Sequence, residues 1–341
     1  MGATPATAPP TTPEVRLPAL RNAALGDADH RTLNAQHDIA ASLRLCGRYN
    51  DAFAVDERTV DEQRRLLGVR HPYTLRSELA YATDLLLLGR YAEAKSAQKK
   101  NARELRKTMG QDNPHTLEAE HNLALCHYRG GDRSTAWKLL TDLLQRSERV
   151  LGETYPITLR LAISQSNFAR AHGDIDQARQ VGETVVARYE AALSEDHPFV
   201  AGVRANQALI LRSTGERIEA YAMIEKARAD MAAAVGMSHP WTLGCAINAS
   251  GLRNLIGDVE SAASLSEDTV TRATEVLGRE HPLTLCARVA HASDLRSLKK
   301  HKEAEEVEQA VLQDFARTLG AQHAASLSAR SRERPAWDFE P

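Results

Sequence analysis

The sequence contains no apolar run long enough to cross a membrane. Its best candidate, LLLL at residues 85–88, follows Asp84 and ends at Gly89. A membrane-spanning helix needs about 20 predominantly apolar residues. The opening stretch, MGATPATAPPTTPEVRLPAL, lacks both the basic start and the apolar centre of a secretory signal. We therefore expect neither a transmembrane segment nor a membrane partner.

Cysteine, aromatic residues and net charge are equally scarce. The four cysteines, Cys46, Cys126, Cys245 and Cys286, are widely spaced and form no CxxC motif. This spacing argues against a disulfide framework and against a zinc site, and it favours a reducing cytoplasm. The net charge is −2 and only 5% of residues are aromatic. We therefore expect no nucleic-acid partner, because a basic surface and stacking platforms are both missing.

What the sequence does contain is a repeat. The stretch LGREHPLTL at residues 277–285 has related copies along the chain, and its glycine position recurs every 42 residues. A fixed period of this size indicates a stacked array of identical units, and it argues against two separate globular domains. The glycine position is occupied by Gly26, Gly68, Gly110, Gly152, Ser194, Gly236, Gly278 and Gly320.

Each unit is predicted to be a pair of helices. In the unit that starts at Gly68, Pro72 suits the first turn of a helix, where its missing N–H costs nothing. Apolar residues then recur at helical spacing up to residue 88, and Gly89 ends this first helix. A second helix is expected from RYAEA to about Met109, before Gly110. No stretch alternates polar and apolar residues as a strand would.

Three positions inside the unit identify the repeat type. A glycine recurs in the middle of the unit, a small residue stands seven positions before it, and an alanine stands five positions after it. This spacing resembles the tetratricopeptide repeat (TPR), in the 42-residue form found in kinesin light chains and in many actinomycete TPR proteins. The glycines are Gly47, Gly89, Gly131, Gly173, Gly215 and Gly257, with Lys299 in the last unit.

The resemblance implies an all-α fold. We expect a right-handed α-solenoid of about seven 42-residue TPR helix pairs plus a C-terminal capping half-repeat, over residues 24–330. A disordered lead rich in Pro, Ala and Thr is expected at residues 1–23. Residues 331–341 form a C-terminal tail in which Trp337 and Phe339 are expected to anchor on the last helix pair. The alternative is that this acidic, aromatic tail is itself a ligand for a groove, either in the same chain or on a neighbouring molecule.

A narrower resemblance concerns the C-terminal region. The stretch SEDTVTRATEVLGREHPLTL at 266–285 and the ending RERPAWDFEP look like the C-terminal TPR region of actinomycete FxSxx-COOH-system TPR proteins. Those proteins are associated with ribosomally made peptides. Members usually carry an NTPase-like domain before the repeats, whereas this chain has no GxxxxGK[ST] motif. The resemblance implies a stand-alone binding array whose ligand is a precursor peptide or its modifying enzyme.

The recurrent histidine has two interpretations. His71, His197, His239, His281 and His323 share one offset in the repeat and could form a ladder of metal ligands. Equivalent positions on stacked helices lie at least about 8–10 Å apart, so they cannot converge on one ion. We therefore interpret them as helix-start residues that satisfy free backbone N–H groups. With no HExxH or GxSxG motif either, we expect no metal, no cofactor and no catalytic residues.

The TPR resemblance places the binding surface on the inner face of the first helix of each unit. It implies that this concave face takes the residues 13, 10, 9, 6, 3 and 2 positions before the mid-unit glycine. Asparagine at these positions can grip a peptide backbone, because its amide both donates and accepts, and arginine suits carboxylates. The candidate groove residues are Asn122, Asn206, Asn248, Asn167, Tyr128, Arg129, Arg170, Arg212, Asn254 and Arg296.

The alternatives concern these arginines and the first two units. The arginines could instead be solvated, or pair with Asp or Glu on adjacent helices, and surface pairs of that kind contribute little to stability. The first two units present Leu45, Leu79, Leu86 and Leu87 on this face, as a hydrophobic pocket or as packing against the lead. We expect a non-catalytic scaffold for a peptide or protein partner. The other hypotheses are a peptide-responsive regulator that changes shape, and an enzyme or maturation factor with a site in the groove.

Overall fold

The computed structural model describes residues 30–341. The lead expected at residues 1–23 lies outside the described residues, as does most of the first helix joint. Within residues 30–341 the chain forms fifteen α-helices and no strand. The all-α prediction is therefore confirmed.

The helices form seven consecutive pairs followed by a short final helix. We call the first helix of each pair an A helix and the second a B helix. The pairs are α2 (His30–Leu45) and α3 (Tyr49–Leu67), α4 (Pro72–Leu87) and α5 (Tyr91–Met109), α6 (Pro114–Arg129) and α7 (Arg133–Leu151), α8 (Pro156–His172) and α9 (Ile175–Ala192), α10 (Pro198–Thr214) and α11 (Arg217–Val235), α12 (Pro240–Leu255) and α13 (Val259–Leu277), and α14 (Pro282–Ser297) and α15 (His301–Thr318), with α16 (Ala324–Arg330) as the half-repeat.

The A helices begin at the residues that the sequence predicts. Proline occupies the first turn of every A helix from α4 to α14. All five recurrent histidines cap the helix that follows, since Nδ1 of each accepts a hydrogen bond from the backbone N–H two residues later. Asn113 caps α6 through its side chain in the same way. The interpretation of the histidine column as helix caps is therefore confirmed.

Small residues let the two helices of a pair approach closely. The seven small residues that precede the mid-unit turn, from Ala40 to Ala292, are at most 4% exposed. The seven alanines that follow the turn, from Ala52 to Ala304, are fully buried at 0%. Packing at the crossing therefore leaves no room for a larger side chain at either position. Each helix packs on the next along the chain, as in a TPR solenoid.

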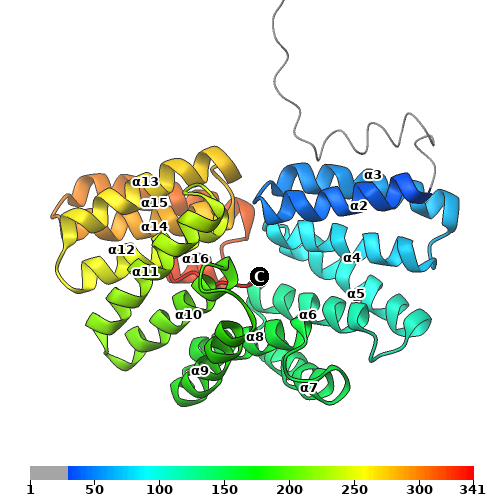
Figure 1. Ribbon diagram of the computed structural model, residues 1–341. Helices are drawn as coiled ribbons and strands as arrows, with labels where there is room; N and C mark the ends of the chain where they lie inside the picture. Colours follow the sequence, from blue (N-terminus) through cyan, green and yellow to red (C-terminus); the bar gives the residue numbers. More distant parts are fainter. Residues whose placement is uncertain (1–29) are drawn as a thin grey trace, which may run out of the picture.

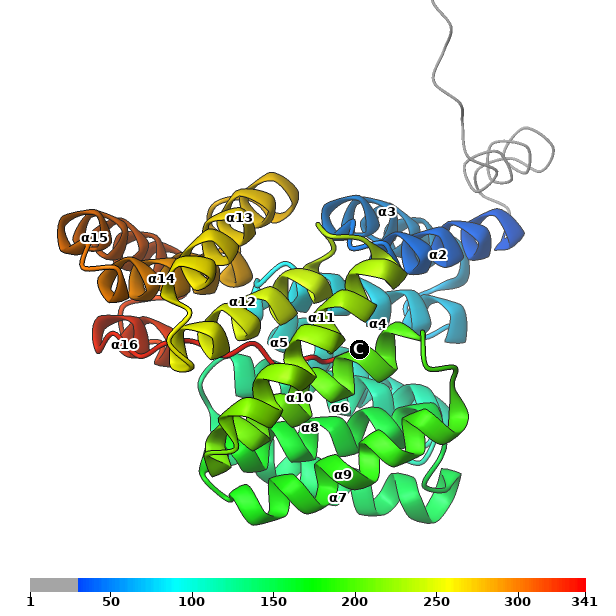
Figure 2. The ribbon, with the colours of Figure 1, turned by 60° about the vertical axis from the view of Figure 1, so that its left-hand side comes forward.

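The solenoid turns far enough for its end to contact its beginning (Figures 1 and 2). Nε2 of His281, at the start of α14, lies 2.8 Å from the carbonyl oxygen of Leu87, at the end of α4. His239 and His323 make the same contact with Leu45 and Arg129, each also 194 residues earlier. The spacing corresponds to between four and five 42-residue units. The last three histidines thus join two levels of the superhelix.

This contact assigns the histidine tautomer and explains one glycine. Since Nδ1 of His281 accepts from Leu283 N–H while Nε2 faces a carbonyl oxygen, the ring is neutral and protonated at Nε2. Burial lowers the pKa of His281 to about 4, despite the opposing effect of the Leu87 carbonyl. Gly89 has φ of 77°, and a Cβ at this position would overlap the ring of Pro282. Both features belong to the closure between levels.

None of the helices in the described part of the chain combines the length and the hydropathy that crossing a membrane requires.

The closure predicts that two glycines at the same mid-unit position of the repeat differ in importance. Gly89 and Gly173 have φ of 77° and 90°, but nothing lies within 4 Å of a Cβ at Gly173. We expect Gly173→Ala to lower the free energy of unfolding by about 1–2 kcal/mol, the cost of a left-handed non-glycine residue. Gly89→Ala should cost a further ~1–3 kcal/mol, because Pro282 must move. Urea unfolding measures both, and equal costs would show that the two levels do not touch in solution.

The buried histidines predict acid sensitivity at the closure. Because the folded-state pKa of His281 lies below its ordinary value of 6.5, its stabilising effect is complete above pH 6.5 and is lost as the pH falls toward about 4. His281→Asn keeps the cap, as Asn113 does, but loses the inter-level bond. We expect the free energy of unfolding of the wild type to exceed that of this variant by about 1 kcal/mol at pH 7.5. Urea unfolding should show that this difference disappears by pH 4.5. His197→Asn, whose ring makes no inter-level bond among residues 30–341, is the control and should not lose this stability of about 1 kcal/mol at pH 7.5.

Candidate peptide-binding site on the inner face

The tail, residues 331–341, runs through the interior of the superhelix. It leaves α16 and crosses the A helices in reverse order (Figures 1 and 2). Arg334 contacts Asp294 of α14, Trp337 contacts α12, Phe339 contacts α10, and Glu340 reaches Arg129 at the end of α6. Trp337 and Phe339 thus make their hydrogen bonds to α12 and α10, and the expectation that they anchor on the last helix pair is wrong in this respect. The tail occupies the inner face in cis, as the alternative had it.

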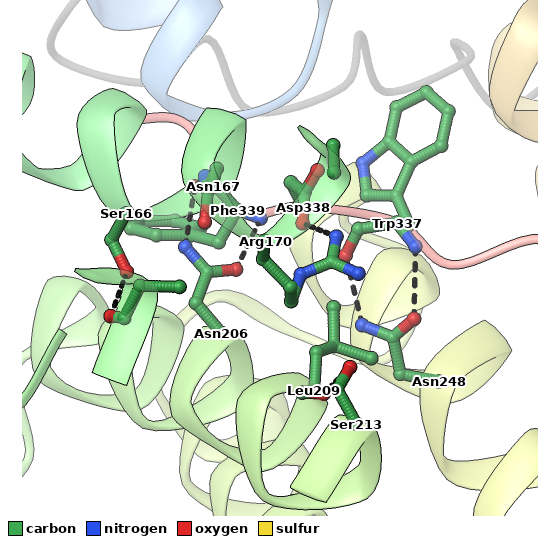
Figure 3. Close-up of polar contacts among 12 residues, drawn as sticks. Ser166, Asn167, Arg170, Asn206, Leu209, Ser213, Asn248, Trp337, Asp338 and Phe339 are labelled. Atoms are coloured by element: carbon green, nitrogen blue, oxygen red, sulfur yellow. Dashed lines mark hydrogen bonds and ion pairs between the residues drawn. The ribbon is translucent and has the colours of Figure 1, made fainter. Parts of the chain in front are cut away.

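Two asparagines hold the backbone of the tail (Figure 3). Phe339 N–H donates to Asn206 Oδ1 at 2.8 Å, and Asn206 Nδ2 donates to the Phe339 carbonyl at 2.9 Å. Asn248 makes the same pair of bonds with Trp337, at 2.9 and 2.8 Å. Asn167 Nδ2 donates a further bond to the Phe339 carbonyl at 3.2 Å. These amides bind main-chain groups, so this part of the contact is independent of side-chain identity.

The geometry sets a register of two tail residues per repeat. Asn206 and Asn248 are equivalent positions 42 residues apart, and they bind residues 339 and 337. In an extended chain the N–H and C=O of one residue point to the same side, and consecutive side chains point to opposite faces. Trp337 and Phe339 therefore share one face of the tail, and Asp338 and Glu340 share the other.

The aromatic side chains fill space left by glycines inside helices. Phe339 is 5% exposed and lies against Gly202 of α10, where a Cβ would overlap its ring. Trp241 meets Phe339 edge to face at a centroid distance of 5.4 Å. The Trp337 ring lies against Gly244 of α12, 2.5 Å from where a Cβ would stand. Glycine inside a helix costs about 1 kcal/mol relative to alanine, and here it makes room for an aromatic ring.

The acidic side chains of the tail meet two arginines. Asp338 Oδ1 lies 2.6 Å from Nη2 of Arg170, and Glu340 Oε2 accepts bonds of 2.8 and 3.2 Å from Arg129. Burial disfavours the charge on Arg170, but the Asp338 carboxylate outweighs it and raises the pKa of Arg170. Burial raises the pKa of Glu340 against the opposing attraction of Arg129. Ion pairs withdrawn from water in this way need both partners, because either charge alone would be left uncompensated.

Two further contacts fix the ends of the bound segment. The Arg129 guanidinium lies over the Trp337 ring, 4.8 Å from its centroid. Arg334 binds Asp294 through both terminal nitrogens, at 2.5 and 2.8 Å, and donates to Ser250 at 2.8 Å. Arg129 thus contacts both an acidic and an aromatic side chain of the tail.

The structure brings together some of the predicted groove residues. Asn167, Asn206, Asn248, Arg129 and Arg170 all bind the tail. Tyr128 and Arg212 line a pocket beside it.

The remaining candidates engage their neighbours in the solenoid. Asn122 donates to Thr83 at 3.0 Å, and Asn254 donates to Asp294 and Ser297. Arg296 pairs with Glu308 of α15 at 2.5 Å. For Arg296, the alternative that it pairs with an acidic residue on an adjacent helix is therefore the correct one.

The leucines of the first two units, which were expected on the inner face, differ in their exposure. Leu79 is only 4% exposed and belongs to a core cluster with Leu75 and Leu105, whereas Leu45 is 58% exposed. Leu86 is half-buried and packs against two core clusters.

The sequence contains one feature that could have predicted the aromatic contacts, namely the glycines inside α10 and α12. Gly202 and Gly244 stand 13 positions before the mid-unit glycines Gly215 and Gly257, an offset that the TPR resemblance assigns to the concave face. A glycine inside a helix usually has a packing or functional reason. Comparison of this offset among the units would have marked α10 and α12 as the place where something packs closely.

No group of three or more His, Cys, Asp or Glu side chains among residues 30–341 is arranged to hold a metal ion.

Comparison with known proteins supports the repeat assignment. Two family models described as tetratricopeptide repeat match residues 31–100 and 161–199. A search of curated protein sequences finds no match.

Solved structures share the fold. The Cut9–Hcn1 hetero-tetramer of APC/C matches with TM-score 0.57 and 12% identity, over 94% of this chain and 55% of that chain. A Rap protein complexed with Competence and Sporulation Factor matches with TM-score 0.55 and 10% identity, over 89% of this chain and 97% of that chain. A putative kinesin light chain of Podosopora anserina, with nearly identical TPR-like repeats, is 25% identical over 59% of this chain and 95% of that chain, with TM-score 0.46. The two family models, with the two structures whose TM-scores are 0.57 and 0.55, support a solenoid of TPR units.

The glycine contact predicts a way to release the tail without removing it. Gly202→Ala places a methyl group where the Phe339 ring lies, while alanine favours the helix over glycine by about 1 kcal/mol. We expect chymotrypsin to cleave after Trp337 and Phe339 at least tenfold faster in the variant than in wild type, as followed by mass spectrometry. The helical circular dichroism should be retained. Continued protection of the tail in the variant would contradict the docked position of Phe339.

Proposed function

We propose that this chain is a non-catalytic scaffold that binds an extended peptide segment of a partner protein on its inner face. The observation that carries the proposal is the docked tail. Asn206 and Asn248 each make a donor and an acceptor bond to the main chain of an extended segment. Such contacts suit any extended peptide, and the pockets around them supply the preference for particular side chains.

The tail also indicates which peptides would fit. Aromatic side chains at alternate positions would enter the spaces beside Gly202 and Gly244. Acidic side chains at the intervening positions would meet Arg170 and Arg129. A segment of the form aromatic–acidic–aromatic–acidic satisfies both faces. Bidentate and charge-assisted bonds to arginine are stronger than neutral ones, so the acidic positions add affinity as well as selectivity.

A partner must compete with the tail. Because the tail is covalently attached, it acts at a high effective concentration, which for short flexible connections is in the millimolar range. The apparent affinity of an external peptide is reduced by the fraction of molecules whose inner face is free. The tail therefore sets a threshold that only a better ligand or a high local concentration overcomes.

The narrower hypothesis concerns the identity of the peptide. The resemblance of residues 266–285 and of the C-terminal ending to FxSxx-COOH-system proteins supports a ribosomally made precursor peptide or its modifying enzyme as the partner. An extended, flexible precursor segment is the kind of ligand that a main-chain clamp accommodates.

A calorimetric titration tests the proposal with a peptide of the tail sequence. The peptide RERPAWDFEP is added to full-length protein carrying Trp337→Ala and Phe339→Ala, which frees the inner face. We expect binding with 1:1 stoichiometry and weaker binding to wild type, where the native tail competes. Adding Asn206→Ala and Asn248→Ala should weaken binding at least a hundredfold, since four main-chain bonds of about 1 kcal/mol each are lost.

Asn122→Ala is the matched control, because Asn122 occupies the equivalent position but bonds to Thr83 and not to the tail. It should leave the affinity within about twofold of the parent. If the Asn206 and Asn248 substitutions changed affinity no more than Asn122→Ala does, the asparagine clamp would not be the binding mode.

A further inference from the structure

A pocket lies between the tail and the A helices that surround it. Its volume is about 360 Å³, and residues 333–338 of the tail form one side of it. The opposite side comes from Tyr128, Arg170 and Arg212 on α6, α8 and α10, and from residues of α14 and α15. The pocket thus requires the docked tail as one of its walls.

The lining of this pocket carries an excess of positive charge. The carboxylates that line it are Glu333 and Asp338. The arginines that line it are Arg129, Arg133, Arg170, Arg212 and Arg334. Two of these five guanidinium groups lack a carboxylate partner among residues 30–341, as the individual contacts show.

Three of the arginines have their charge balanced. Arg129 pairs with Glu340 at 2.8 Å, Arg170 with Asp338 at 2.6 Å and Arg334 with Asp294 at 2.5 Å. Arg133 bonds only to the Ala171 carbonyl, at 3.3 Å, and its guanidinium lies 6.0 Å from the Tyr128 ring centroid.

Arg212 is the exception among the partly buried arginines of the pocket. It makes no hydrogen bond and no ion pair with any residue in the described part of the chain. Burial, together with the positive charges of Arg170 and Arg334, lowers the pKa of Arg212 to about 10 against the attraction of Asp338. Its five N–H donors therefore have no acceptor among residues 30–341, and the side chain lines the pocket.

We infer that this pocket is a binding site for a small molecule with a phosphate or equally compact dianionic group, held by Arg212 beneath the docked tail. Guanidinium forks match the oxygens of such groups. Val289, Phe315 and Leu319 line the same pocket, so a ligand can also place an apolar or ring-shaped part there. A volume of about 360 Å³ falls in the range of small-molecule sites. The inference needs only the docked tail and does not depend on a peptide partner.

The experiment uses the full-length protein and two probes, inorganic phosphate and phenyl phosphate. Each is titrated calorimetrically in Hepes buffer at constant ionic strength, with sodium acetate as the monoanionic control. We expect one saturable site per chain for both probes and tighter binding of phenyl phosphate, whose ring reaches the apolar wall. Acetate should bind at least tenfold more weakly. Absence of a saturable signal from both phosphates would overturn the inference.

Arg212→Gln identifies the site. Because Arg212 has no carboxylate partner to strand, we expect this variant to be at least as thermally stable as wild type without phosphate, and to bind either probe at least tenfold more weakly. Arg217→Gln, at the exposed start of α11, makes the same charge change and should bind as wild type does. Equal affinity in the Arg212→Gln and Arg217→Gln variants would show an adventitious ion only.

The outcome is separable from that of the peptide titration. Asn206 and Asn248 do not line the pocket, and Arg212 makes no bond to the tail backbone. Failure of the peptide to bind would leave the phosphate result intact, and failure of the phosphate to bind would leave the asparagine clamp intact.

Discussion

The contact between helix starts and helix ends 194 residues apart is the constraint on which the rest of the structure depends. A TPR solenoid is held together by neighbours along the chain, and its interior is open unless successive levels meet. Here His239, His281 and His323 bond to carbonyl groups at the ends of α2, α4 and α6. Each histidine uses one ring nitrogen for its own helix and the other for the level opposite. That contact brings α6, α8, α10, α12 and α14 around one space, and the tail lies in it.

The enclosed space changes what the inner-face residues can do. In an open groove, Arg129 and Arg170 would be solvated, and pairs with exposed acids would contribute little. With the tail docked, both are largely removed from water, and each needs its carboxylate. The asparagines act differently, because neutral amides satisfy main-chain groups whatever the peptide sequence. The two kinds of contact have different roles: Asn206 and Asn248 set the position and register of the tail, and the arginines and helix glycines contact its side chains.

The sequence predicted the helices well because each boundary is a local event. Pro72 and Gly89 bound α4, and Pro114 starts α6, each through the conformation of one residue. The site was less predictable because equivalent positions differ only in what comes to lie against them. Asn122 and Asn206 share one offset in the repeat, yet Asn122 binds Thr83 and Asn206 binds the tail.

The histidines show the same behaviour. His71 and His281 share a second offset in the repeat, yet of these two only His281 has a carbonyl group of another level within reach. No periodicity in the sequence distinguishes these pairs, since the pitch of the superhelix decides which of them meet. Gly202 and Gly244 are the exception, because their cost inside a helix is visible in the sequence itself.

The tail takes part in both proposed sites, so binding at one site would be coupled to binding at the other. It occupies the asparagine clamp and also forms one wall of the arginine-lined pocket. A peptide that took its place at Asn206 and Asn248 would remove that wall, and an anion held by Arg212 beneath the tail would stabilise the docked state. If both proposals hold, each ligand would lower the affinity of the other by the same factor, because coupling between binding equilibria is reciprocal. Arg129 lies at the junction, bonded to Glu340 and stacked on Trp337, so release of the tail would also leave its charge without a partner. The free guanidinium groups of Arg129 and Arg170 would then be available to the acidic positions of an incoming peptide, which makes the exchange of one acidic segment for another the favoured route.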